Sequence, residues 1–388
     1  PRPVAAEQLP LADDELLLAY ALGEEASYLF VVRKGGVQRV LRIPIKQAVL
    51  EEKIKSFLEP LTNRHPQDFS VQRAGELYQL LLAEGLAAAR PTDRLIIVPD
   101  GILGTLPFEI LASRSGSSVS DSAYLGERYA IAYLGERYAI AYYQSASLLS
   151  LKRTLPAGQP SRTLFALGNP DFGSSGGGEP GFRGLAITPK QHGQQILFPP
   201  LPETEIEVRR IAALLGTAVQ PPDVLLRQQA SEAMLKQTPL GDYRYLHFAT
   251  HASLPGLIRE VNEPFILLSQ QNKQEGNDGF LTLSEVLDLR LNARLVVLSA
   301  CVTGVGKEVE GEGVVNFARA FQSAGAGSVV VSLWEVASEP AVEYVTFFYG
   351  YLKQGLPHAQ ALKQAREQMR RRYPNPFYWG VFVLHGEG

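Results

Sequence analysis

The sequence predicts a mixed α/β protein made of two successive α/β units. Three observations support this prediction. Apolar strand-like runs alternate with amphipathic helical stretches, the alternation starts again near residue 160, and residues 150–161 between the two series lose their apolar periodicity. With 388 residues, the chain is long enough for two domains. We therefore place one unit at residues 1–155 and the other at residues 160–388.

Three apolar runs in the N-terminal unit have the composition of strands, and Gly35-Gly36 within the second is a hairpin signal. Two stretches between these runs carry apolar residues at helical spacing. Strands are expected at residues 16–22, 27–44 and 94–101, and helices at residues 46–61 and 74–90. Strand, helix and strand in alternation imply a parallel or mixed sheet covered by helices.

The same alternation continues through the C-terminal unit. Strands are expected at residues 162–170, 243–252, 294–300, 328–334 and 378–386, and helices at residues 203–216, 284–291, 316–326, 342–355 and 358–372. Residues 172–195 are rich in glycine and lack periodicity, so we expect a mobile surface loop there.

A nine-residue segment, YLGERYAIA, occurs twice in tandem, at residues 124–132 and 133–141. Nine residues are too few for a solenoid repeat. Because an odd insertion reverses the faces of any strand that it lengthens, only one copy is expected to keep the native register.

Composition restricts the function classes. Hydrophobic residues make up 45% of the chain and charged residues 20%, as in ordinary globular proteins, and the net charge of −3 disfavours a nucleic-acid partner. The single cysteine excludes an internal disulfide and fits a reducing compartment. No apolar run approaches the roughly 20 residues that span a bilayer. We expect a cytoplasmic protein without membrane contact and, because the sequence does not begin with methionine, a piece of a longer chain.

The candidate catalytic residues are Cys301, the only cysteine, and His251. Each closes an expected strand at the point where the chain enters a turn, and they lie 50 residues apart. Adjacent parallel strands bring their carboxyl ends side by side, which is where open α/β sheets bind ligands. A cysteine nucleophile acts as the thiolate, and a neighbouring histidine can take its proton. This spacing matches the known caspase pattern, in which the histidine precedes the cysteine by about 50 residues.

A metal site is the alternative interpretation of this segment, because His247 and His251 have the spacing of a zinc-binding helix. Phe248 stands where the HExxH motif has its glutamate, and the run has the composition of a strand, on which residues four apart are roughly 13 Å distant. We therefore expect no metal and no cofactor, and we interpret His247 as a histidine on the strand that either belongs to the core or supports the site from behind.

Several segments resemble the CHAT domain, a caspase-like peptidase domain related to separases and metacaspases and often found behind tetratricopeptide repeats. The resemblance rests on HFATHAS, LTLSEVLDLRLNARLVVLSACVTG, GEGVVNFARAFQSAGAGSVVVSLWEV and the closing NPFYWGVFVLHG. It extends from about residue 162 to the end of the chain. SYLFVVRKGG and RLIIVPDGILGTLPFEIL resemble the first part of the same domain. The resemblance implies two caspase-like α/β sandwich units, of which the first is degenerate and the second carries the cysteine and histidine.

By this resemblance the protein is a cysteine endopeptidase that cuts a protein substrate. Cys301 is the nucleophile, His251 is the general acid and base, and the backbone N–H groups of Ala252 and Cys301 form the oxyanion hole. The family usually has glycine at the position of Ala252. A regulatory N-terminal region or activator of the tetratricopeptide type is the expected partner.

The resemblance also suggests which residues contact substrate. Ser299, two residues before the cysteine, and Trp334-Glu335, after the next strand, would line the pocket for the residue preceding the scissile bond. No arginine stands at these positions, so a caspase-like preference for aspartate is not expected. Acidic residues that could hold a basic residue are Glu335, Asp278, Glu308, Glu310 and Glu312, while an apolar preference also stays open.

A catalytically silent caspase-like scaffold is the competing hypothesis. The intact Cys301 and His251 favour activity, whereas Ala252 and the duplicated YLGERYAIA favour the scaffold. A third class, an α/β hydrolase acting on small molecules, requires a nucleophile elbow, and the chain contains neither GxSxG nor GxCxG.

Overall fold

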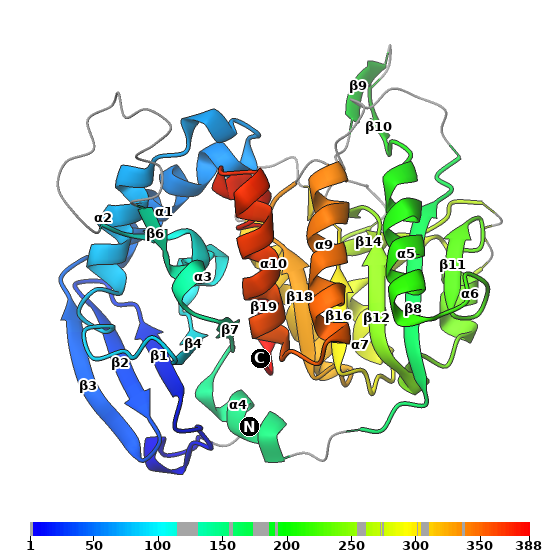
Figure 1. Cartoon of the computed structure of the whole chain (residues 1–388). Helices are drawn as coiled ribbons and strands as arrows, with labels where there is room; N and C mark the ends of the chain where they lie inside the picture. The colour runs from blue at the N-terminus through cyan, green and yellow to red at the C-terminus, as the bar shows by residue number, and fades with distance from the viewer. Residues whose placement is uncertain are drawn as a thin grey trace. The chain divides into compact units, whose positions relative to one another are not determined.

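The protein is described from a computed structural model, in which the chain divides into two compact units (Figure 1). Unit 1 comprises Pro1–Leu155, Arg370–Gly380 and Glu387–Gly388, and unit 2 comprises Pro156–Met369 and Val381–Gly386. Two late segments of the chain thus group with its N-terminal part. The structure describes residues 3–114, 131–154, 158–173, 186–190, 193–253, 261–271, 273, 275–300, 302–303, 310–335 and 338–388.

Five strands of unit 1 follow one another in the order β7-β4-β1-β2-β3. β1 runs parallel to β4 and antiparallel to β2, and β4 runs parallel to β7. The predicted hairpin between β2 and β3 is confirmed, with Gly35 and Gly36 at φ +92° and +127°. The strands are β1 Glu15–Ala21, β2 Ser27–Arg33, β3 Gly36–Ile43, β4 Arg94–Val98, β5 Ala112–Arg114, β6 Ile131–Tyr133 and β7 Ile140–Tyr142.

The helices of unit 1 include the two that the sequence predicts before β4. Ser70 caps the second of these, because its hydroxyl accepts a hydrogen bond from the amide of Arg73. The α-helices are α1 Gln47–Thr62, α2 Val71–Leu81, α3 Leu134–Arg137 and α4 Ala146–Thr154, and the 3-10 helices are η1 Ala6–Gln8, η2 Pro66–Asp68, η3 Gly101–Thr105, η4 Phe108–Ile110 and η7 Pro376–Tyr378. The sequence predicts no periodic structure at residues 150–154, and this prediction is wrong, because these residues belong to helix α4.

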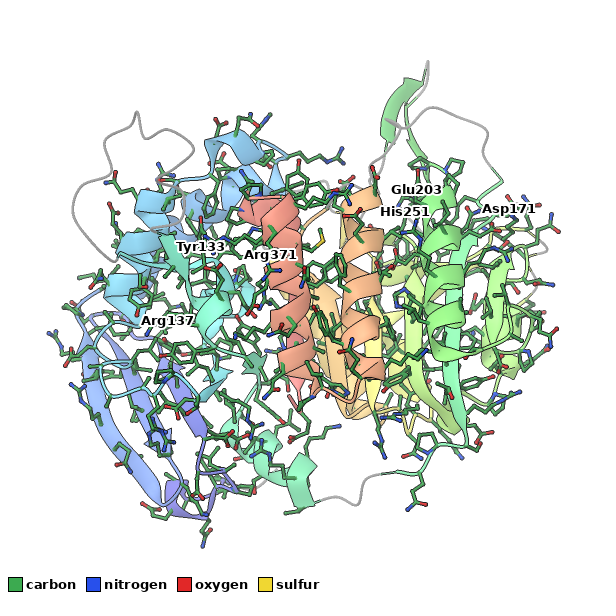
Figure 2. All side chains as sticks on the ribbon, viewed as in Figure 1. Tyr133, Arg137, Asp171, Glu203, His251 and Arg371 are labelled. Carbon is green, nitrogen blue, oxygen red and sulfur yellow. The ribbon has the colours of Figure 1, made fainter. Side chains whose placement is uncertain are left out.

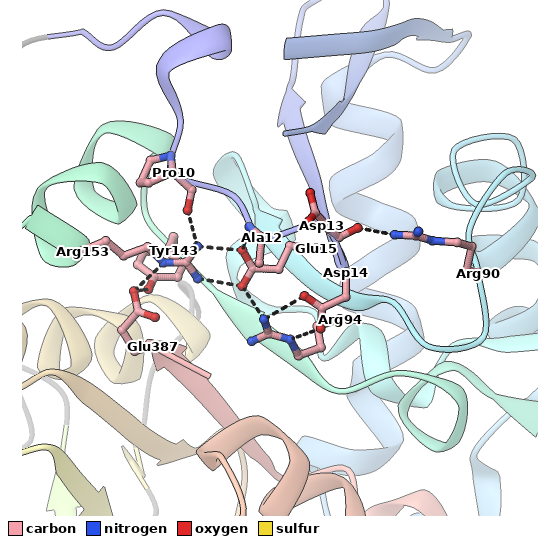
Figure 3. Close-up of polar contacts among 10 residues, drawn as sticks. All are labelled: Pro10, Ala12, Asp13, Asp14, Glu15, Arg90, Arg94, Tyr143, Arg153 and Glu387. Atoms are coloured by element: carbon pink, nitrogen blue, oxygen red, sulfur yellow. Dashed lines mark hydrogen bonds and ion pairs between the residues drawn. The ribbon is translucent and has the colours of Figure 1, made fainter. Parts of the chain in front are cut away.

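A buried polar cluster joins segments of unit 1 that are distant in sequence (Figure 3). The carboxylate of Glu15 on β1 accepts two hydrogen bonds from Arg153 of α4, at 2.7 and 2.8 Å. Arg94, at the start of β4, lies 3.2 Å from the same carboxylate, and Arg153 also donates to Glu387 near the C-terminus at 2.9 Å. Strands β1 and β4, helix α4 and the C-terminal residues are therefore tied together by charge.

Six strands of unit 2 follow the order β11-β8-β12-β16-β18-β19. The first five are mutually parallel and β19 is antiparallel to β18. Their residues are buried almost throughout, as expected for parallel strands covered on both faces. The strands are β8 Arg162–Pro170, β11 Val224–Arg227, β12 Tyr243–Ala249, β16 Leu295–Leu298, β18 Ser328–Ser332 and β19 Phe382–Gly386.

Helices cover both faces of these strands. Tyr349 of α9 contacts Tyr245 and His247 of β12, whereas Phe321 of α8 contacts Phe248, the residue that follows His247. Because successive strand residues point to opposite faces, α8 and α9 lie on opposite sides; Figure 1 shows α5 beside α9. The helices are α5 Pro202–Leu215, α6 Glu232–Gln237, α7 Leu283–Asp288, α8 Glu310–Ser323, α9 Ser338–Lys353 and α10 His358–Arg372, with 3-10 helix η6 at Leu240–Asp242.

Short strands extend unit 2 beyond the carboxyl ends of the main strands. Four of them form a small sheet in the order β15-β14-β13-β17, and two more form the hairpin β9-β10. They are β9 Ala186–Lys190, β10 Gly193–Leu197, β13 Ala252–Ser253, β14 Phe265–Leu267, β15 Phe280–Thr282 and β17 Val302–Thr303. The sequence predicts a mobile surface loop over residues 172–195, but residues 186–190 and 193–195 lie in strands; residues 174–185 and 191–192 are outside the described part of the chain.

Most of the remaining predicted elements of unit 2 are confirmed with small shifts in their bounds. Helix α5 ends where predicted, because Gly216 adopts the left-handed conformation at φ +70°. Of the tandem repeat, the second copy contributes α3 and the start of β7, and the first copy lies outside the described residues except for its last two positions. Among the described residues, no helix has the length and apolarity needed to cross a lipid bilayer.

Candidate active site

Two pairs of parallel strands carry the candidate site. Phe248 of β12 pairs with Leu298 of β16, and after a short interruption Ala252 of β13 pairs with Val302 of β17. The offset between partners is 50 residues in both ladders, before and after the interruption. The predicted adjacency of the two parallel strands is confirmed.

His251 lies in that interruption, directly before β13, and its side chain is only 1% exposed. The rings of Phe172 and Phe198 pack against the imidazole, with centroid distances of 5.2 and 6.0 Å. Its Nε2 atom is 2.9 Å from the carbonyl oxygen of Pro199. Two phenylalanine rings and a backbone carbonyl therefore hold the imidazole in place. Figure 2 shows His251 toward the same end of unit 2 as Glu203 and Asp171.

The contact with Pro199 fixes the tautomer of His251. A carbonyl oxygen can only accept a hydrogen bond, so Nε2 must carry the proton. In the neutral ring the basic nitrogen is then Nδ1. This is the atom through which the imidazole can take a proton from a neighbouring thiol.

The backbone around His251 is set by β14. The amide of Leu267 donates to the carbonyl of His251 at 2.9 Å, and the hydroxyl of Thr250 donates to the carbonyl of Leu267 at 2.6 Å. Since the N–H and C=O groups of successive strand residues point to opposite edges, the N–H of Ala252 points toward β17. Ala252 is extended, so its position does not require glycine.

His247 is a core residue on the face of β12 covered by α5 and α9. Its Nε2 is 2.9 Å from Oε1 of Glu207 on α5, and both side chains are fully buried. The hydroxyl of Tyr349 on α9 lies 3.4 Å from its Nδ1. Burial, with Tyr245 and Glu207 nearby, holds the pKa of Tyr349 well above its usual value. The interpretation of His247 as a core histidine agrees with this environment.

Ser299, Trp334 and Glu335 are all buried. Ser299 directly follows β16, and Trp334 and Glu335 lie within three residues of the end of the neighbouring strand β18. The amide of Ser299 donates to the carbonyl of Phe248 at 2.9 Å. The hydroxyl of Ser332 donates to the carbonyl of Ala300, the residue after Ser299, at 2.8 Å. This bond ties the end of β18 to the residue before Cys301. The structure thus brings these three candidates to the same strand ends as His251.

Asp278 lies elsewhere. It is exposed in the turn before β15, the strand farthest from β17 in the small sheet, and its carboxylate accepts a hydrogen bond from the amide of Phe280. Cys301 and Glu308 lie outside the described residues, and of Glu310 and Glu312 only the backbone of α8 is described. Within the described part of the chain, no group of three or more histidine, cysteine, aspartate or glutamate side chains is arranged to hold a metal ion.

Sequence reasoning missed the three residues that contact the ring of His251. Phe172, Phe198 and Pro199 fall in or beside the glycine-rich stretch, where no periodicity marks them. A backbone carbonyl has no sequence signature, because every residue carries one.

A helix-covered sheet of mainly parallel strands, with a histidine at the carboxyl end of a central strand, defines a caspase-like α/β protein, and the predicted fold class is confirmed. The chain belongs to the CHAT domain family, whose family model matches residues 71–387. The resemblance seen in the sequence is therefore correct.

Two curated relatives are the tetratricopeptide repeat protein 28 of Mus musculus and that of Homo sapiens. They are 27% and 28% identical over 348 and 361 residues, which cover 80% and 83% of this chain. The chain spans only 13% of the length of each relative. These relatives link the domain to tetratricopeptide repeat proteins.

Among solved structures, the chain is similar to two crystal structures of the Saccharomyces cerevisiae separase–securin complex. The TM-scores are 0.54 and 0.50, with 11% and 10% identity, and the matches cover 98% and 96% of this chain and 30% of the other chain in each case. At such low identity, the likeness shows a shared fold.

Proposed function

We propose that this protein is a cysteine endopeptidase that hydrolyses peptide bonds of a protein substrate. Cys301 supplies the thiolate nucleophile and His251 the general base and acid. The observation that carries the proposal is the constant 50-residue offset of the two ladders that flank these residues. The same offset separates Cys301 from His251 in the sequence, which supports the proposal that these two residues are neighbours.

In the proposed mechanism, Nδ1 of His251 takes the proton of the Cys301 thiol, and the thiolate attacks the carbonyl carbon of the scissile bond. The carbonyl oxygen becomes an oxyanion, which the backbone N–H groups of Ala252 and Cys301 stabilise. The C–N bond then breaks, and the leaving amine takes the proton from His251. A water molecule, deprotonated by the same imidazole, finally hydrolyses the thioester and regenerates the thiol.

We propose Ala252 for the oxyanion hole because it pairs with Val302 of β17, the strand that begins one residue after the proposed nucleophile. Loss of a single oxyanion donor typically costs about 100- to 1,000-fold in kcat. Because the donor is a backbone group, a side-chain substitution at Ala252 that keeps the extended conformation leaves it in place.

For the substrate pocket we propose Ser299, Trp334 and Glu335, whose positions at the ends of β16 and β18 support this role. Asp278 is proposed only as a contact for a more distant part of the substrate, since it precedes β15. The names of the relatives support a regulatory region or activator of the tetratricopeptide type as partner. A single cysteine nucleophile must stay reduced, which fits a cytoplasmic location.

Cleavage of a peptide library that varies the residue before the scissile bond tests the proposal. Wild type, Cys301→Ala and His251→Ala are compared by mass spectrometry of the cut sites, with His65→Ala, which alters a histidine of unit 1, as the control. Cuts made by wild type and His65→Ala but lost in the other two variants support the peptidase. Cuts that survive Cys301→Ala would exclude the mechanism.

A catalytically silent caspase-like scaffold is the second candidate, and the 1% exposure of His251 favours it. A buried imidazole under two phenylalanine rings is compatible with a purely structural role. The same library separates the candidates, because the scaffold predicts no cleavage by folded wild-type protein, with or without a tetratricopeptide partner.

A further inference from the structure

The buried pair formed by His247 and Glu207 connects the two elements that meet at His251. His247 lies on β12, the strand that leads into His251 four residues later. Glu207 lies on α5, and the segment that enters this helix carries Phe198 and Pro199 onto the imidazole. Strand and helix thus reach the same ring from two directions.

The contact between His247 and Glu207 joins β12 to α5. Its length is 2.9 Å and neither side chain is exposed to solvent, so the bond competes with no water. The first turn of α5 is also tied to the neighbouring strand β8, because the amide of Asn169 donates to the hydroxyl of Thr204 at 2.7 Å. The contact made by Glu207 links α5 to β12, the strand that leads into His251.

We propose that His247 and Glu207 are positioning residues for His251, because their bond fixes α5 against β12 and so holds the Pro199 carbonyl on Nε2 of His251. The bond selects the tautomer and orientation of the proposed base without either residue touching substrate. This inference rests on the proposed function for its catalytic meaning. The geometric part, control of the bond between His251 and Pro199, does not depend on activity.

The first test is nuclear magnetic resonance of protein labelled with ¹⁵N-histidine. The bonded Nε2–H of His251 is expected as a protected, downfield resonance, identified by its absence from His251→Gln. Glu207→Ala is expected to shift or broaden it, while Glu207→Gln, which keeps an acceptor oxygen, retains it. Asp93→Ala is the control, because it removes a buried carboxylate that pairs with Arg33 and Arg90 in unit 1.

Should Glu207→Ala not fold, the double variant His247→Leu/Glu207→Met takes its place, because two apolar groups fill the volume without leaving a buried charge unpaired. An altered His251 resonance in either variant, with the control unchanged, supports the proposal. A His251 resonance identical to wild type in the folded variant would overturn the proposal. An altered His251 resonance in the control Asp93→Ala would also overturn it.

Kinetics provide the second readout. With an active peptidase, the variants are expected to lower kcat about 10- to 100-fold per reactive Cys301 thiol while KM stays constant, since a misplaced base costs the chemical step and not binding. A merely structural pair would lower the fraction of folded enzyme and leave kcat per thiol unchanged. If wild type cleaves no peptide, the proposed function fails, and the resonance experiment still decides the positioning role.

Discussion

Removal of the Glu15 carboxylate should destabilise unit 1 strongly. Glu15 is buried and accepts hydrogen bonds from Arg153 at 2.7 and 2.8 Å and from the amide of Ala12 at 2.8 Å (Figure 3). Arg94 lies 3.2 Å away. Glu15→Ala therefore leaves two guanidinium groups facing each other without the carboxylate between them.

The magnitude follows from burial. Breaking a buried ion pair by removing one partner costs about 3–5 kcal/mol. Arg153 and Arg94 keep 18% and 25% of their side-chain surface exposed, so water compensates part of the loss. We expect Glu15→Ala to lower the free energy of unfolding of unit 1 by about 3 kcal/mol. Glu25→Ala, which removes an exposed pair with Lys46, should change it by about 0.5 kcal/mol or less.

The chain contains two tryptophans, which makes the assay specific for unit 1. Trp379 belongs to unit 1 and is buried against Tyr133, whereas Trp334 belongs to unit 2. Urea unfolding followed by fluorescence in a Trp334→Phe background therefore reports unit 1. A loss below about 1 kcal/mol for Glu15→Ala would refute the reasoning, because the cluster would then behave like exposed ion pairs.

The pH dependence of the free energy of unfolding, compared between wild type and Glu15→Gln, is a second check. Burial by itself would raise the pKa of Glu15, but hydrogen bonds from Arg153 and Ala12 outweigh it and lower the pKa below its usual 4.5. The stability that Glu15 contributes is then complete above about pH 4.5 and is lost as the pH falls through the lowered folded-state pKa. The gap between wild type and Glu15→Gln should narrow over that window.

Two further predictions concern unit 2. Burial lowers the pKa of His385 to about 4, so the unfolded chain binds a proton near pH 6.5, before the folded chain does. The free energy of unfolding should therefore fall by about 3 kcal/mol between pH 6.5 and pH 4. Urea unfolding midpoints of His385→Gln should lack this loss. Gly168→Ala should lower the free energy of unfolding by about 1–3 kcal/mol, because its Cβ would lie 2.8 Å from both the Thr204 carbonyl and the Val208 side chain of α5. Gly104→Ala is the control, because its Cβ would meet no atom within 4 Å. Urea unfolding of both variants checks this prediction.

The strands that position the site could be predicted because buried parallel strands leave a strong signal. Residues 294–300 and 243–252 have the composition of strands, and the structure places β16 and β12 there as neighbours. Adjacency at the carboxyl ends followed from the rule for open α/β sheets. Residue spacing alone thus led to the part of the site that backbone topology fixes.

The surroundings of His251 could not be predicted in the same way. Phe198 follows the β9-β10 hairpin, whose strands are short and contain proline and glutamine in place of regular apolar alternation. The grouping of Arg370–Gly380 with unit 1 is similarly invisible, because apolar periodicity reports which residues are buried and not which unit buries them. Long-range contacts decide both features.

The choice of a carbonyl as the partner of His251 has a chemical consequence for the proposed mechanism. A carboxylate on Nε2 would stabilise the charged imidazolium and raise the basicity of the ring, whereas a neutral carbonyl fixes the tautomer with a smaller effect on the charged form. With the proton on Nε2, Nδ1 is the basic atom that a general base requires. Orientation must in that case come from the packing of the segment that carries Pro199. In the proposed mechanism, the placement of α5 and the buried bond between Glu207 and His247 would take over the task that a third titratable side chain performs in a catalytic triad.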